Sequence, residues 1–278
     1  MSYSFQTNVT SLVAQQNLRV NSDFQSRTIT RLTSGYRINS SGDDAAGLAV
    51  ANKLRSDTTE LQQGVRNAND GVSILQIVDG GLNNISNILD RLKTLATESA
   101  SDTFSGNRAT LNTEFTGLLS EIDRQAANIG LSSGTTGGRF NLSLDVYIGG
   151  GDTQAHAKVV IDLSGAANKV DTTGLGITGN GVGSKANALT ALTNLTTAIS
   201  NLGLVQGAVG TGENELNYAV QLAQSQISSF SAAQSSIRDA DVATEAANLT
   251  KAQILEQSSV AALAQANAAP QALLKLLQ

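Results

Sequence analysis

The chain has 278 residues, of which 15% are charged, and a formal net charge of -5. It has no cysteine and a single histidine, His156, which excludes a disulfide framework, a thiolate nucleophile and a metal site built from several histidines. With 18 Lys and Arg residues, the chain lacks the basic excess that neutralises phosphate groups, so we expect no nucleic-acid partner.

The composition also predicts long, uninterrupted helices. Proline normally makes up about 5% of residues and charged residues about 25%, whereas this chain has only Pro270 and few charges. No run approaches the roughly 18 apolar residues of a membrane span, and residues 1–24 lack the cationic start and apolar core of a Sec signal peptide. We expect a helical protein that does not span a membrane and is not secreted by the Sec route. Its weakly charged surfaces should contact a partner.

Residues 1–34 predict a first helix, because apolar side chains recur there at helical spacing. Its only charges are Arg19, Asp23, Arg27 and Arg31. Gly35 and Gly42, with two serines between them, predict a break after this segment.

Steps of three and four residues then trace two further helices. A stripe from Leu61 to Leu92 predicts a helix over about 44–99, and a second stripe starts at Leu111 and ends before Gly130, a plausible stop. At 1.5 Å per residue the longer helix would extend about 80 Å.

The middle of the chain has a different pattern. Apolar residues alternate from Phe140 to Ile148 and again from Val159 to Leu163, with a glycine-rich turn between, so a β-hairpin is predicted at about 139–165. Residues 174–183 are too rich in glycine for a helix or strand and predict a loop.

The chain returns through a helix whose stripe runs from Leu192 to Leu202 and from Leu216 to Phe230. The last segment, 252–278, carries only Glu256 and Lys275 as charged side chains. The predicted fold class is therefore mainly α: an elongated, antiparallel, coiled-coil-like helical rod with a small β-hairpin in mid-chain. We divide it into 1–44 and 235–278, which form a terminal helical domain, and a body over 45–234.

The uncharged polar faces of the two ends indicate that something else covers them. An isolated surface helix normally carries charges opposite its apolar stripe, and a short helix alone is marginal in water. We expect each end to gain its order by burial against copies of the same chain. The predicted assembly residues are Phe5, Val9, Leu12, Val13, Val20, Phe24, Leu249, Val260, Leu263, Leu274 and Leu277.

Three patterns that could indicate chemistry have simpler interpretations. Gly174, Gly176 and Gly179 match G-x-G-x-x-G, but no good strand precedes them and no amphipathic helix follows, which favours a tip loop over dinucleotide binding. His156 has no nearby carboxylate constellation, which favours an ordinary strand residue. Asp43 and Asp44 open the long helix, which favours capping over acid–base chemistry. We expect no enzymatic activity, cofactor or metal.

Two long motifs resemble bacterial flagellin. The first is LTSGYRINSSGDDAAGLA at 32–49, followed by RNANDGVSI at 66–74; the second is IRDADVATE at 237–245, followed by AQIL at 252–255, LAQAN at 263–267 and Pro270-Gln. The resemblance covers roughly 1–130 and 185–278, with the motifs in family order.

That resemblance implies a subunit that polymerises into the flagellar filament for swimming. It also implies secretion through the flagellar type III apparatus, an export chaperone, contact with the cap and hook-junction proteins, and an extracellular location. The terminal helices would line the inner tube and the body would form the outer tube. Because only a hairpin and a loop occupy the centre, the chain resembles a short, minimal flagellin. A hook–filament junction or related axial protein is the alternative.

The same resemblance implies a contact with the vertebrate innate receptor for flagellin. The segment DRLKTLA at 90–96 places Arg91 and Leu95 at the matching positions, with Glu114 on the next helix. These residues would also lie where subunits stack along the filament axis.

Overall fold

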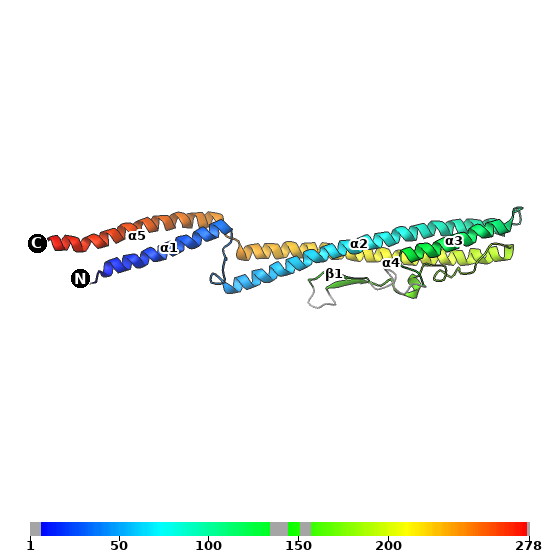
Figure 1. The fold of residues 1–278 in the computed structure, drawn as a ribbon, viewed down its shortest axis with the longest axis horizontal. Helices are drawn as coiled ribbons and strands as arrows, with labels where there is room; N and C mark the ends of the chain where they lie inside the picture. The colour runs from blue at the N-terminus through cyan, green and yellow to red at the C-terminus, as the bar shows by residue number, and fades with distance from the viewer. Residues whose placement is uncertain (1–6, 134–143, 151–156, 277–278) are drawn as a thin grey trace. The chain divides into compact units, whose positions relative to one another are not determined.

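A computed structural model describes residues 7–133, 144–150 and 157–276, with side chains up to residue 269. Within these ranges the chain forms five α-helices, one short 3-10 turn and one two-stranded antiparallel sheet (Figure 1). The mainly α fold class with one small hairpin is confirmed.

The helices begin and end where short polar residues and glycine satisfy free backbone groups. Helix α1 (Val9–Ser34) starts at Asn8, whose side chain accepts from the Ser11 N–H, and it ends at Gly35, which has a left-handed φ of 72°. Helix α2 (Ala45–Ala100) follows Asp44, whose carboxylate accepts from the Gly47 N–H at 2.8 Å. The predicted break and the predicted long helix are therefore both present.

The remaining helices are α3 (Arg108–Asn128), α4 (Lys185–Arg238) and α5 (Val242–Leu276). Asn107 caps α3 through the Ala109 N–H, and Gly130 follows its end with a φ of 77°. Asp241 caps α5 by accepting from the Ala243 N–H at 2.9 Å.

The chain packs as two compact units. The terminal unit comprises residues 1–56 and 229–278, and the body unit comprises 57–228. Both borders fall inside helices, α2 and α4, whereas the predicted borders at 44/45 and 234/235 lie nearer to the breaks between helices.

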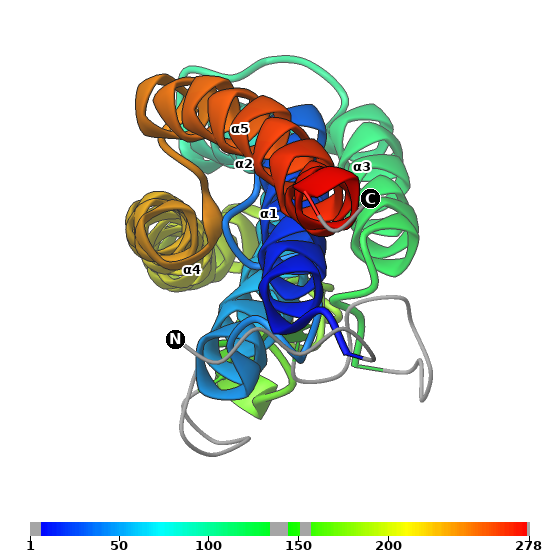
Figure 2. The same ribbon diagram turned by 90° about the vertical axis from the view of Figure 1, so that its left-hand side faces the viewer.

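The core of the body unit comes from the predicted apolar stripes. Helices α2, α3 and α4 run alongside one another in the views of Figures 1 and 2. The fully buried side chains of this core recur at heptad-like spacing, and each faces another helix. They include Leu75, Leu82, Leu89 and Leu92 from α2, Phe115 and Ile122 from α3, and Leu195, Leu202 and Leu216 from α4.

Helix α4 also contains a stretch long and apolar enough to span a membrane by length and composition alone. Helices buried in a protein core pass the same test. One third (33%) of the apolar stretch is buried within the protein, and Leu195, Leu202 and Val205 of α4 lie in the body-unit core.

The hairpin packs directly on glycine positions of α2. Strands β1 (Leu144–Tyr147) and β2 (Lys158–Ile161) pair antiparallel, with Val146 opposite Val159. A Cβ at Gly64 would overlap the main-chain carbonyl oxygen of Ile148, and a Cβ at Gly71 would lie 3.0 Å from a methyl group of Val146. Glycine at these two positions therefore lets the hairpin backbone reach the helix surface.

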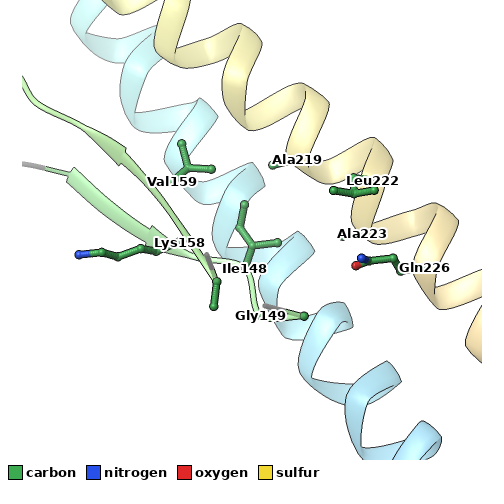
Figure 3. Close-up of a pocket in the computed structure, with 10 residues that line it drawn as sticks. Ile148, Gly149, Lys158, Val159, Ala219, Leu222, Ala223 and Gln226 are labelled. Carbon is green, nitrogen blue, oxygen red and sulfur yellow. The ribbon is translucent and has the colours of Figure 1, made fainter. Parts of the chain in front are cut away.

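A small cavity of about 110 Å³ lies between α4 and the end of the hairpin at Ile148 and Ala157 (Figure 3). Ile148 points from the hairpin toward the helices, where Ala219, Leu222 and Ala223 line the other side. Because most of this lining is apolar and the space is small, the cavity belongs to the packing of the hairpin.

The glycine-rich loop is folded onto the body unit. It carries no helix or strand between 174 and 183, but Leu175, Ile177 and Val182 are buried. Asp171 anchors its start: the carboxylate accepts from the Ser133 N–H at 3.0 Å and from the Gly174 N–H at 2.9 Å. The prediction of a loop agrees with this backbone, and the apolar side chains of the loop pack inward.

Candidate assembly interface

Helices α1 and α5 lie side by side and antiparallel in the terminal unit (Figures 1 and 2). The seam between them buries polar side chains beside apolar ones such as Ala252. Ser11 donates to the Asn267 side-chain oxygen at 2.8 Å, and Asn21 donates to the Ser259 hydroxyl at 2.7 Å. Ser11 and Ser259 are buried, whereas a typical helix pair buries apolar side chains along its contact.

A buried ion pair lies toward the end of the same seam. The Arg31 guanidinium is 3.3 Å from the Glu245 carboxylate, and Glu245 is only 7% exposed. Asn248 also donates to this carboxylate, at 3.3 Å. Removing Arg31, whose side chain is one third exposed, would leave the Glu245 carboxylate buried without its cation, so the pair constrains how the two helices meet.

The apolar side chains of α1 and α5 are on the outside of the pair. Of the predicted assembly residues, Val9 is 61% exposed and Val260 is 52% exposed. Leu12, Val13 and Val20 are more than half exposed as well, while Phe24, Leu249 and Leu263 are half-buried beside the seam. Phe5 and Leu277 lie outside the described residues, and Leu274 lies in α5 where side chains are not described.

Sequence analysis missed four further exposed apolar residues in helices α1 and α5: Ile29, Val242, Ile254 and Leu255. Val242 lies about two turns before Leu249, outside the segment 252–278 in which the last stripe was traced. The others face away from the stripes that steps of three and four residues trace, so a search for a single apolar face passes over them. Their exposure enlarges the unpartnered apolar surface to more than one side of the pair.

Two open grooves follow the pair of helices. One, of about 440 Å³, is lined by Thr10, Val13, Leu255, Ser259 and neighbouring small residues. The other, of about 740 Å³, is lined mainly by Gln25, Gln253, Glu256, Gln257 and Val260. Apart from Glu256, these linings carry no charge, so apolar and amide side chains of another molecule could enter without leaving a buried unpaired ion.

The two connections between the terminal helices and the rest of the chain are joined to each other. Tyr36 and Asp239 form an antiparallel bridge, and the Arg37 N–H donates to the Arg238 carbonyl at 2.7 Å. The Arg238 guanidinium lies 4.1 Å from the centre of the Tyr36 ring, in a cation–π contact. The connections are therefore ordered, hydrogen-bonded parts of the terminal unit.

Two aspartates stabilise these connections through their ionised forms. Backbone N–H groups of Ser40 and Asn39 donate to Asp43 and lower its pKa. The Thr244 hydroxyl and the N–H groups of Thr244 and Ala243 similarly lower the pKa of Asp241. Both carboxylates are solvent-exposed. Asp241 caps α5, whereas Asp43 closes the turn before α2 and Asp44 is the residue that caps α2, so the capping interpretation holds for Asp44.

The residues implied by the receptor resemblance separate into two groups. Arg91 and Glu114 are exposed and form an ion pair between α2 and α3 at 2.6 Å. Leu95 is 1% exposed and packs in the body-unit core. A contact through the Leu95 side chain is therefore wrong for this conformation, because the neighbouring helices already cover it.

The other candidate sites gain no support as chemical centres. His156 lies outside the described residues. Gly176 and Gly179 have left-handed φ values of 72° and 73°, which a turn requires, and α4 begins only at Lys185. Among the described residues, no group of three His, Asp or Glu side chains is arranged to hold a metal ion.

Comparisons with known proteins agree with this geometry. The model of the bacterial flagellin N-terminal helical region matches residues 5–130, and that of the C-terminal helical region matches residues 175–277. The chain is 33% identical to a flagellin of Halalkalibacterium halodurans and 35% identical to a flagellin of Listeria monocytogenes. It is 30% identical to flagellin FlaB1 of Treponema pallidum, and all three alignments cover 98% of both chains.

A crystal structure of Bacillus cereus flagellin aligns with a TM-score of 0.47 at 26% identity, over 56% of this chain and 88% of that chain. The family models match both helical ends, and the relatives match along almost the whole length without a large central insertion. The chain belongs to the bacterial flagellin family.

Proposed function

We propose that this chain is a structural subunit that polymerises into the filament of the bacterial flagellum, which serves swimming motility. The supporting observation is the packing of the terminal unit, where polar side chains are buried in the α1–α5 seam and Val9, Leu12, Val13, Val20 and Val260 are exposed. Family membership gives the context, because relatives along the full length carry the names flagellin and flagellar filament core protein.

The energetic case rests on what a second copy could cover. Fully burying a Val or Leu side chain contributes about 1.5–3 kcal/mol. Val9, Leu12, Val13, Val20 and Val260 are each roughly half exposed, so covering the remainder would contribute about 1 kcal/mol per side chain. Five such side chains on one subunit provide a substantial part of what a specific interface needs after the cost of ordering.

Location and partners follow from the same proposal. We infer secretion by the flagellar type III apparatus with an export chaperone, growth beneath the cap, and attachment to the hook-junction proteins. The filament would be extracellular, and the role would be structural and not enzymatic. Membership of the flagellin family supports these inferences.

Contact with the vertebrate innate receptor remains a proposal for Arg91 and Glu114 alone. Their ion pair presents both charges on the exposed surface of α2 and α3. Leu95 is left out, because substituting a core residue would weaken the fold and obscure any effect on binding.

The alternative is a hook–filament junction or related axial protein. A junction protein adds a limited number of subunits, whereas a filament protein polymerises without limit. Long filaments formed by the purified chain would favour the filament role, and only short assemblies under the same conditions would favour the junction role.

The decisive experiment changes exposed apolar residues and leaves the fold intact. We expect Leu12→Gln with Val13→Gln to retain the helix content and melting temperature of the monomer but to form no filaments, because two polar side chains would have to be buried at the interface. The matched control is Val160→Gln, an exposed residue of β2 in the body unit. Normal filaments from the α1 variant, by electron microscopy and sedimentation, would refute the proposed interface.

Deleting residues 1–34 or 252–278 gives a coarser test of the same idea. The body unit keeps its own core of α2, α3 and α4, so we expect each truncated chain to retain a folded body and lose filament formation. Normal filaments from either truncation would contradict the role of the terminal helices.

A further inference from the structure

The polar seam of α1 and α5 pairs the two helices in one register. Ser11 bonds to Asn267, Asn21 bonds to Ser259, and further along Arg31 meets Glu245. The Asn8 side chain adds a bond to the Ala266 carbonyl at 2.9 Å. From Ser11 to Asn21 to Arg31, the residue number rises in α1 as that of the partner falls in α5, as an antiparallel pair in a single register requires.

A shift of one helical turn would break this order. If α5 moved by four residues in one direction, Leu255 would replace Ser259 opposite Asn21; in the other direction, Leu263 would replace it. In both cases the Asn21 amide, which is partly exposed and also donates to the Leu255 carbonyl at 3.4 Å, would lose its bond to the buried Ser259 hydroxyl. Because an unpaired polar group in a contact destabilises that arrangement, the observed register is favoured over its neighbours.

The register also decides which outward-facing apolar residues become neighbours. In the observed pairing, Val13 of α1 and Leu255 of α5 both line one groove along the pair. A slide of one turn moves one helix by about 5.4 Å along the other and changes the spacing of these side chains. The surface that a second copy meets is therefore composite, and it exists in one register only.

We propose that Ser11, Asn21, Ser259 and Asn267 are positioning residues for polymerisation: their hydrogen bonds hold α1 and α5 in the register that assembles the outward apolar surface. This inference rests on the proposed function. A polar residue that specifies register in a helix pair, at some cost in stability, is an established device of helical assemblies. Here the device fixes the arrangement within a subunit before another subunit adds to it.

The test compares two pairs of substitutions at one contact. In the apolar variant, Asn21→Leu and Ser259→Ala remove the hydrogen bond and retain a side chain of similar size at 21. In the swapped variant, Asn21→Ser and Ser259→Asn exchange the two partners, so that an amide can still donate to a hydroxyl across the seam. The swapped variant is the matched control, because it changes the same two positions and keeps the polar contact.

Register is measured on the monomer and assembly is measured separately. The chain has no cysteine, so Gln16→Cys and Lys251→Cys, both at exposed positions, can carry spin labels for distance measurement. We expect one distance in the parent and the swapped variant. We expect the apolar variant to show a second population whose distance differs from the parental one, by up to about 5.4 Å for a slide of one turn.

The expected effect on filaments follows from the fraction of subunits in the competent register. If that fraction falls to about one tenth, the critical concentration rises about tenfold. The swapped variant should assemble at the parental concentration. An apolar variant that keeps the single parental distance overturns the register claim, and a displaced register with parental assembly overturns the positioning role.

The two hypotheses can fail separately. If the unlabelled parent forms no filaments under any condition, the proposed function is refuted and the positioning role falls with it. The monomer distances would still decide whether the seam sets the register. If the parent polymerises and both variants behave as the parent does, only the present inference is overturned.

Discussion

Replacing Gly64 by alanine should detach the hairpin from the body unit. Gly64 lies within α2, where alanine is normally the better helix former by about 0.5–1 kcal/mol. At this position, however, the added Cβ would overlap the carbonyl oxygen of Ile148. A main-chain oxygen cannot rotate away as a flexible side chain can, so the end of the hairpin must move.

The size of the effect follows from what that movement exposes. Val146 and Ile148 are each only 6% exposed, and full burial of such a side chain contributes about 1.5–3 kcal/mol. Half-exposing both would cost about 1.5–3 kcal/mol, against which the helix gains about 0.5–1 kcal/mol. The expected net loss is about 1–2 kcal/mol, or about 2–8 °C in the melting temperature of a unit of this size.

Gly80→Ala is the matched control, because Gly80 lies on the same helix and a Cβ there would meet nothing within 4 Å. We expect this variant to gain about 0.5–1 kcal/mol. Calorimetry of the monomer should therefore show shifts of opposite sign for the two substitutions. A Gly64→Ala melting temperature at or above that of the parent would refute the close-approach argument.

Two further outcomes concern carboxylates. The folded-state pKa values of Asp43 and Asp241 are lowered, so their stabilisation is complete above the ordinary pKa of about 3.9 and is lost as pH falls through the lowered values. Helix content measured from pH 7 to pH 2 should fall below pH 4, and less steeply in an Asp43→Asn, Asp241→Asn variant; identical acid profiles would contradict the stabilising role of these carboxylates. Asp171→Ala should destabilise the body unit by about 2 kcal/mol, because two loop N–H groups lose a buried acceptor. Exposed Asp162, whose carboxylate accepts from Ser164 in its own turn, should tolerate alanine with less than about 0.5 kcal/mol of loss by denaturant titration.

The helices could be predicted because their apolar residues repeat at the helical period. The stripe from Leu61 to Leu92 led to α2, and Gly35 and Gly130 marked helix ends that the structure confirms. The alternation on either side of Gly149 similarly led to the hairpin. In each case the pattern lies within one segment of the sequence, and the element that packs beside this segment is consistent with it.

The polar seam could not be predicted in this way. Ser11, Asn21 and Ser259 are found frequently on exposed helix faces, and only their partners, more than 230 positions away, distinguish them. A search for apolar stripes therefore identifies the outer faces of α1 and α5 and passes over the contact between them.

The burial of Leu95 and of the side chains in the glycine-rich loop could not be predicted for a related reason. Leu95 was assigned from its place in a motif, which does not reveal which face of α2 the neighbouring helices cover. Leu175 and Ile177 are separated by glycine and look like isolated apolar residues in a loop, yet both are buried. Tertiary packing decides these positions, and sequence spacing carries little trace of it.

The polar contact between α1 and α5 has a thermodynamic consequence. The heat capacity of unfolding rises mainly with the exposure of apolar surface. Melting this helix pair in the free subunit should therefore raise the heat capacity only slightly. Covering its outer side chains in a polymer should instead produce a large negative heat-capacity change. Growth should then be driven by the entropy of released water near room temperature and should weaken on cooling.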